Sequence, residues 1–173
     1  MNDGLEQARE RRNILEELGS KIPGFSGYLE REMRREVDKL QRDWLAHQVD
    51  RARFAINGKV RDWTRKGRLD LLDLAGSTEK SLDRLANRIR HADYGSSGFF
   101  DAVKIGEAEL DRLYAFDLAL TDTVEYLALQ VEQLPDTADE EMLRRLLDAT
   151  ESADRKFDER ATVFEEVTQT GGA

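Results

Sequence analysis

Few side chains in this sequence are able to do chemistry, and the most unusual of them is an aspartate within an apolar stripe. The 173-residue chain has no cysteine and only two histidines, His47 and His91. The lack of cysteine excludes disulfides, zinc–cysteine sites, iron–sulfur clusters and a cysteine nucleophile. Asp117 lies between Leu113 and Leu120 at the spacing of a packed helix face. A buried carboxylate is costly unless it is paired, so Asp117 needs a partner.

His47 and Arg51 are the candidate partners of Asp117. Asp117 follows Phe99 at nearly the same sequence separation at which His47 follows Tyr28, and the two aromatic residues are the expected starts of two long helices. If both helices start at the same end of a bundle, the two side chains lie at a similar height, about 27 Å along it. Three interpretations stay open. They are a buried ion pair with His47 or an arginine that fixes the register, a carboxylate turned to the rim, and a metal or acid–base site.

The histidines do not fit the metal site that helical bundles often carry. Ferritin-like di-iron bundles use glutamates together with paired Glu-x-x-His motifs, and this chain has no Glu-x-x-His. His91 lies near the end of a predicted helix, where the helix dipole favours a cation. We therefore expect no metal ligand, no cofactor and no catalytic residue, and we interpret the protein as non-enzymatic.

Two loops share the pattern Gly-x-Ser-Gly-aromatic, and each directly precedes a long predicted helix. In one interpretation their serines are N-caps and their aromatic side chains close the core. In the other, apolar side chains dock a protein partner, or backbone amides at two helix N-termini bind an anion. The docking candidates are Pro23, Phe25, Tyr28, Tyr94, Phe99 and Phe100, and the anion candidates are Gly24, Ser26, Gly27, Gly95, Ser97 and Gly98.

The same two loops carry a resemblance to other proteins. The segments IPGFSGY, residues 22–28, and YGSSGFFD, residues 94–101, are similar to stretches in small, uncharacterised bacterial all-helical proteins. The resemblance covers residues 20 to 117. It implies a bacterial, all-helical protein and carries no function, substrate or partner with it.

Helical periodicity dominates the elements that must position these residues. Apolar residues recur every three or four positions, which predicts helices at 5–18, 28–66, 69–92, 99–134 and 138–168, with a frayed tail at 168–173. We expect Gly19 and Gly67 to be C-caps, Gly76-Ser77 to interrupt its helix and Asn57-Gly58 to add a kink. Thr137 and Glu140 form a candidate capping box. The stripe of the last helix runs through Phe157, Ala161 and Phe164.

Short connections at 67–68 and 135–137 require antiparallel neighbours. The fold class is therefore all-α: one domain over 1–173, built as a long up-down bundle of four main helices plus a short N-terminal helix. The strict three–four repeat of 99–134 is typical of coiled-coil packing. Because helices 28–66 and 99–134 start at the same end of such a bundle, the two glycine loops should be neighbours.

Charge is unevenly distributed along the chain. Residues 1–98 carry 20 basic and 17 acidic side chains, whereas residues 99–173 carry 7 and 19, for a total of −9. Residues 28–68 are the most basic stretch, but acidic residues interrupt them, which disfavours a nucleic-acid surface. No apolar run reaches the roughly 20 residues of a membrane span, and no signal peptide is visible, so we expect a cytoplasmic protein without membrane insertion.

These patterns favour a non-enzymatic helical interaction or scaffold protein that docks an unidentified protein partner through the two glycine loops. The coiled-coil seam of 99–134 is also consistent with a homo-oligomer. One alternative is a ferritin-like bundle that binds a metal or a ligand. The other is weak binding of nucleic acid or an anionic membrane surface through the basic helix 28–66.

Overall fold

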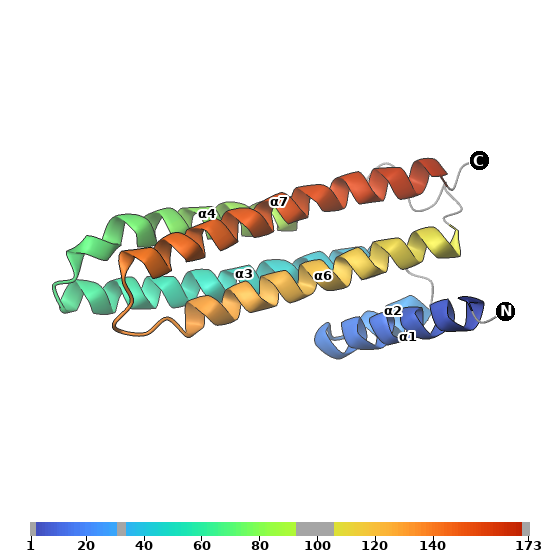
Figure 1. Ribbon diagram of the computed structural model, residues 1–173, viewed down its shortest axis with the longest axis horizontal. Coiled ribbons are helices and arrows are strands. Elements are labelled where there is room, and N and C mark those ends of the chain that lie inside the picture. Colours follow the sequence, from blue (N-terminus) through green and yellow to red (C-terminus); the bar gives the residue numbers. More distant parts are fainter. Residues whose placement is uncertain (1–2, 31–33, 93–105, 171–173) are drawn as a thin grey trace. The chain divides into compact units, whose positions relative to one another are not determined.

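The computed structural model describes residues 3–30, 34–92 and 106–170, and these residues form an all-α protein. The α-helices are α1 (Asp3–Lys21), α2 (Phe25–Glu30), α3 (Arg34–Arg65), α4 (Leu72–His91), α6 (Glu107–Glu132) and α7 (Glu140–Thr170). A short 3-10 helix, η1 (Leu69–Leu71), precedes α4. The long helices pack antiparallel in a bundle, and no strand occurs among the described residues (Figure 1). The predicted fold class is confirmed.

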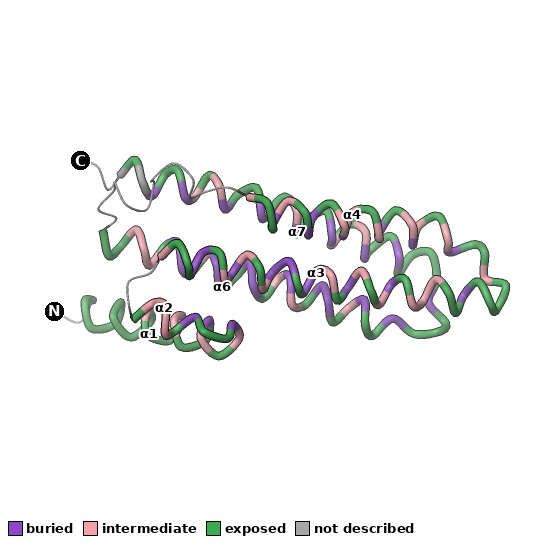
Figure 2. The backbone as a smooth tube through the Cα atoms, turned by 180° about the vertical axis from the view of Figure 1, so that it is seen from behind, coloured by how far each residue is buried: buried purple, intermediate pink, exposed green. Residues whose placement is uncertain are grey.

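The contacts divide the chain into two compact units. Unit 1 comprises residues 1–44, 93–120 and 158–173, and unit 2 comprises residues 45–92 and 121–157. Helices α3, α6 and α7 each contribute one stretch to unit 1 and another to unit 2. Within each unit the buried residues line the inner faces of the helices, and the outer faces are exposed (Figure 2). None of the helices formed by the described residues has an apolar run able to cross a bilayer.

The N-terminal region of unit 1 holds two helices where the sequence predicted one. Helix α1 continues through Gly19 to Lys21, so Gly19 is not a C-cap. A β-carbon at Gly19 would collide with the Ser26 hydroxyl, and glycine therefore lets α2 approach α1 closely. Gly24 connects the two helices with φ of 84°, a left-handed conformation that side chains disfavour. The segment expected to be a loop is thus a tight turn followed by a helix.

The connection from α3 to α4 contains Gly67, the predicted C-cap of α3. Gly67 has φ of 72°, and the Arg68 amide donates to the Trp63 carbonyl at 2.9 Å, which together form a Schellman motif. Helix α4 continues without a break across Gly76-Ser77, so the predicted interruption is wrong. The neighbouring Ala75 and Thr78 are fully buried, and this packing offsets the weak helix propensity of glycine, about 1 kcal/mol.

Helices α6 and α7 are joined by residues 133–139. The Met142 amide donates to Oδ1 of Asp139 at 2.8 Å, so Asp139 is the N-cap of α7. The predicted capping box of Thr137 and Glu140 is wrong, and α7 begins two residues later than expected. Aspartate suits this position because it also complements the helix dipole. Helix α6 begins at Glu107, directly after the non-helical Gly106, so the prediction of one unbroken helix over 99–134 is wrong at its start. The predicted first residues of that helix, 99–105, lie outside the described residues.

Candidate functional site

The core of unit 1 contains a buried ion pair between α6 and α7. Nε of Arg160 donates to Oδ1 of Asp117 at 2.7 Å, and Nη2 donates to Oδ2 at 3.2 Å. The Arg160 side chain is 1% exposed and that of Asp117 is 2% exposed. This two-point geometry matches the planar guanidinium to the planar carboxylate and makes the pair directional.

A second carboxylate, from α3, contacts the same arginine. Nη2 of Arg160 lies 2.9 Å from Oδ1 of Asp38, whose side chain is 7% exposed. The other oxygen of Asp38 accepts a 2.9 Å hydrogen bond from Nε of Arg42, one turn along α3. Two carboxylates and two guanidiniums therefore balance in charge inside the unit. We call Asp38, Gln41, Asp117 and Arg160 the polar core.

Burial dominates the electrostatics of the polar core. Desolvation raises the pKa of Asp117 above its ordinary value, and the charge and hydrogen bonds of Arg160 lower it by less. Asp38 adds a repulsion that also raises the pKa of Asp117, while the nearby Gln41 amide lowers it. Burial likewise raises the pKa of the neighbouring Tyr114. The cluster is therefore an ion pair held in the core at a cost, and it fixes three helices to each other within unit 1.

Neither sequence candidate is the partner that the structure gives Asp117. His47 has an exposed side chain and so is not part of a buried pair. Arg51 donates to both carboxylate oxygens of Glu132 on α6, at 2.7 and 2.8 Å from Nη2, and to Gln48 through Nη1. Matching heights along two helices did not identify the partner, because it lies on α7.

Arg160 is absent from the sequence candidates, although its position carries a signal. The buried residues of α7 are Leu143, Leu146, Thr150, Ala153, Phe157, Arg160, Phe164 and Val167, which follow an unbroken three–four repeat. A stripe that runs through Ala161 avoids the charged residue and breaks that repeat. Ala161 is half-buried, whereas Arg160 is nearly inaccessible. A charge that occupies a regular seam position therefore indicates an arginine paired inside the core.

The first glycine loop contributes to the core of unit 1. Phe25 is fully buried in a cluster with Leu18, Ile22, Val37 and Tyr114. Its ring meets the Tyr114 ring edge-on, with centroids 6.4 Å apart and an interplanar angle of 78°. For Phe25 the interpretation that the aromatic side chain closes the core is confirmed, and the alternative that it docks a partner is wrong.

The remaining candidates of that loop differ in exposure. Pro23, Gly24 and Ser26 are exposed, and Gly27 and Tyr28 are half-buried. Ser26 lies inside α2 and is therefore not its N-cap. The Tyr28 ring packs against the core cluster. The second loop, with Tyr94, Gly95, Ser97, Gly98, Phe99 and Phe100, lies outside the described residues, so the pairing of the two loops stays a prediction.

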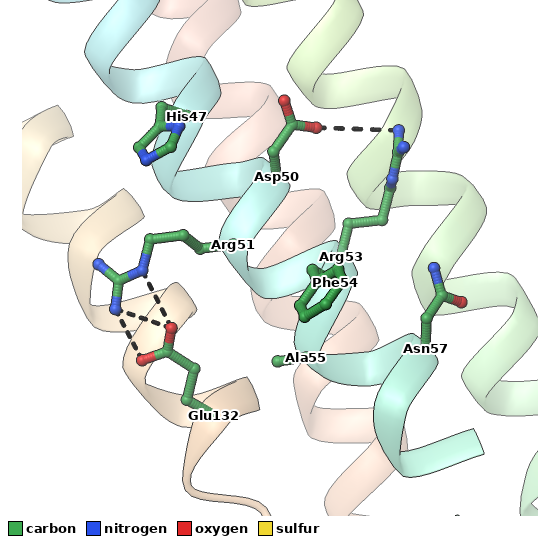
Figure 3. Close-up of a pocket in the computed structure, with 8 residues that line it drawn as sticks. All are labelled: His47, Asp50, Arg51, Arg53, Phe54, Ala55, Asn57 and Glu132. Atoms are coloured by element: carbon green, nitrogen blue, oxygen red, sulfur yellow. Dashed lines mark hydrogen bonds and ion pairs between the residues drawn. The ribbon is translucent and has the colours of Figure 1, made fainter. Parts of the chain in front are cut away.

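A cavity of about 490 Å³ on unit 2 is the second candidate site (Figure 3). Most of its wall comes from α3, and Glu132 of α6 closes one side. Figure 3 shows Arg51 reaching from α3 across to Glu132, while Arg53 and Asn57 point to the opposite side of α3. Phe54 lines the cavity and is 75% exposed. A volume of this size falls in the range of pockets that hold small molecules.

Two further exposed apolar residues lie on α6. Tyr126 is 64% exposed and Leu129 is 42% exposed, and they are three residues apart, on one side of the helix. Leu129 precedes Glu132 by three residues, and Phe54 follows Arg51 by three. The Arg51–Glu132 ion pair joins α3 to α6. We therefore call the following five residues the α3–α6 face: Arg51, Phe54, Tyr126, Leu129 and Glu132.

The alternative functions gain no support from the side chains that the structure describes. Within those residues no three histidine, aspartate or glutamate side chains gather in a way that would hold a metal ion. Several basic side chains of residues 34–66 pair with acidic ones: Arg42 with Asp38, Arg51 with Glu132, Arg53 with Asp83, and Lys59 and Lys66 with Asp136. A phosphate would have to compete with these carboxylates.

Comparison with known proteins assigns the chain to no family. No protein-family model, no curated protein and no solved structure matches it.

Proposed function

We propose that this protein is a non-enzymatic interaction protein that binds an amphipathic helix of a protein partner on the α3–α6 face. The observation that carries the proposal is the 75% exposure of Phe54 beside a cavity of about 490 Å³. The proposal assigns docking to unit 2 rather than to the glycine loops, because Phe25 is a core residue.

The chemistry of the face supports this kind of partner. Phe54, Tyr126 and Leu129 are large and apolar, and covering them with another apolar surface yields roughly 25 cal/mol per Å² removed from water. Aromatic side chains are frequent energetic anchors of protein interfaces. The Arg51–Glu132 ion pair lies between them and already satisfies its own charges, so it forms a polar boundary that needs no compensating charge.

The arrangement on two neighbouring helices favours a helical ligand. Tyr126 and Leu129 lie three residues apart on α6, and Phe54 lies on α3, which the Arg51–Glu132 ion pair joins to α6. An amphipathic helix presents apolar residues at intervals of three and four, which match such spacing. A small polar ligand has little to bind here, because the arginines that line the cavity are engaged by Glu132 and Asp83.

Site-specific photo-crosslinking in the native host tests the proposal. A photo-reactive phenylalanine analogue replaces Phe54 in one strain and Leu69 in another. Leu69 is the matched control because it is also apolar and 63% exposed, and it lies outside the α3–α6 face. We expect one protein to be crosslinked from position 54 and not from position 69, through a segment of amphipathic sequence.

The same experiment can overturn the proposal. Equal crosslinking from both positions would mean that exposed apolar residues of this protein make non-specific contacts and that the α3–α6 face does not select a partner. Crosslinking of Phe54 to a second copy of this chain would replace the foreign helix by self-association. Retention of the captured protein by a Phe54→Ser variant would also contradict the proposal, because the anchor would then contribute nothing.

A further inference from the structure

We propose that the polar core of unit 1 holds one internal water molecule, bound between Asp38 and Gln41. The site goes beyond the proposed function, because it lies in unit 1 and does not depend on any partner. It rests on three features: a cavity of suitable size, two buried polar atoms without a hydrogen-bond partner among the described residues, and a surrounding charge cluster that a dry core would leave poorly solvated.

The cavity has the volume of a single water. It measures about 20 Å³ and is bounded by α3, α6 and α7, with the polar core and Tyr114 among its walls. A cavity needs roughly 10–15 Å³ of this kind of volume to hold a water molecule. A phosphate, a carboxylate or a sugar is several times larger, so size alone restricts the occupant to a water-sized species.

Two of the residues that line the cavity, Gln41 and Asp38, each carry a polar atom that such a water could satisfy. Nε2 of Gln41 and Oδ1 of Asp38 are both buried without a hydrogen-bond partner among the described residues. The Gln41 amide lies close enough to Asp117 to lower the pKa of that carboxyl, but no hydrogen bond of normal geometry joins Nε2 to it. Gln41 is 1% exposed and Asp38 is 6% exposed, so neither atom reaches bulk solvent. Leaving either of them unsatisfied would cost the free energy of removing that polar group from water.

The two atoms are chemically complementary to one water. The amide of Gln41 donates, and the carboxylate of Asp38 accepts, so a water between them accepts the first hydrogen bond and donates the second. Nη2 of Arg160 approaches Oδ1 of Asp38 to 2.9 Å, which gives charge attraction but no hydrogen-bonding geometry for that oxygen. The directional bond is therefore left to the water.

The charges around the cavity favour water over a cation. Arg160 is a permanent cation in the same cluster, and Arg42 and Arg34 lie beside it on α3. A metal ion would have to share two carboxylates with these guanidiniums. A neutral, polarisable molecule suffers no such repulsion, and it lowers the cost of keeping Asp38 and Arg160 ionised in the core.

A high-resolution crystal structure of the full chain tests the proposal directly. We expect one electron-density peak within about 3.2 Å of both Gln41 Nε2 and Asp38 Oδ1. Absence of density there, with both side chains ordered, would overturn the proposal. A peak with short, octahedral oxygen contacts would do the same, because it would identify a cation.

A solution measurement keeps the test independent of crystal packing. The ¹⁷O magnetic relaxation dispersion of water reports the number of long-lived internal waters. We expect Gln41→Leu to reduce the dispersion amplitude by the contribution of one water, because it removes the donor. The matched control is Gln48→Leu, which replaces another buried glutamine of α3, two turns further on, that instead accepts from Arg51. Equal amplitudes in wild type and Gln41→Leu, or equal losses in the two variants, would refute the site.

Discussion

Arg160 and Asp117 face each other across the core of unit 1, joined by hydrogen bonds of 2.7 and 3.2 Å, and neither side chain is more than 2% exposed. An ion pair in this position fixes the register of α7 against α6, because a shift of one turn would leave both charges buried without each other. Asp38 extends the same restraint to α3. The polar core thus specifies which side chains meet, at the cost of desolvating them.

Removing the arginine should destabilise the protein strongly. Arg160→Met preserves the length and packing of the side chain but leaves the carboxylates of Asp117 and Asp38 without their shared cation. Breaking a buried pair from one side typically costs about 3–5 kcal/mol. We expect a loss of this size in the free energy of unfolding, measured by urea denaturation.

The matched control for that variant is Arg112→Met. Arg112 pairs with Glu166, and the two side chains are 59% and 50% exposed, so water screens the interaction. Exposed pairs contribute about 0–1 kcal/mol. Comparable losses in Arg112→Met and Arg160→Met would mean that the buried pair does not hold the core, and would contradict the proposed restraint.

The pH dependence of stability should carry the signature of Asp117. Its pKa is raised in the folded protein, so the folded state binds this proton more tightly than the unfolded state does. The contribution therefore favours folding below the ordinary pKa of 3.8 and is lost as the pH rises through the folded pKa. In Asp117→Asn this loss disappears. We expect the free energy of unfolding of the variant to rise more steeply with pH over that window than that of wild type.

Asp136 provides a control of opposite sign. Its hydrogen bond to Lys66, with the charges of Lys66 and Lys59, lowers the pKa of this exposed carboxyl. It therefore contributes stability above the ordinary value of 3.8 that is lost as the pH falls through the lowered pKa. In Asp136→Asn the free energy of unfolding should therefore fall less steeply than in wild type as the pH is lowered through this range. Parallel profiles for Asp117→Asn and Asp136→Asn would show that one of the two assignments has the wrong sign.

The two phenylalanines singled out by sequence and structure should behave oppositely on truncation. Phe25 is fully buried against Tyr114, so Phe25→Ala leaves a cavity and should cost about 3–5 kcal/mol. Phe54 is 75% exposed, so Phe54→Ala should change the free energy of unfolding by less than about 0.5 kcal/mol. Thermal unfolding followed by circular dichroism compares them. A large loss in Phe54→Ala would mean that this residue packs in the fold and is unsuited to docking.

Much of the fold follows from periodicity, because helix faces are set by the spacing of apolar residues. The pattern from Leu113 to Val131 predicted the buried face of α6, Asp117 included. The predicted C-cap Gly67 ends α3 in a left-handed conformation. Glycine suits that position because it has no side chain to clash with the backbone. These features depend on neighbours within one helix, which the sequence displays directly.

The partner of Asp117 depends on a different kind of information. Asp117 precedes Leu134 by the same number of positions by which Arg160 follows Leu143, so equal counting from the α6–α7 turn pairs the two charges. That count works only when the seam residues on both helices are known, and an arginine is a poor candidate for a seam by hydropathy alone. The role of Phe25 stayed open between docking and core packing for a similar reason, because a turn residue in sequence becomes a core residue only once α2 packs beside Tyr114.

Glycine positions allow a test of backbone rather than side-chain contributions. Gly58 lies within α3 with open space around its α-carbon, so Gly58→Ala should stabilise the protein by about 0.5–1 kcal/mol through a lower entropy of the unfolded chain. Gly67 has φ of 72°, where a β-carbon clashes with the backbone, so Gly67→Ala should cost about 1–2 kcal/mol although nothing surrounds it. Urea denaturation measures both changes. Equal signs for the two variants would show that local space, and not the dihedral angle, determines the outcome, which would contradict the Schellman motif at the end of α3.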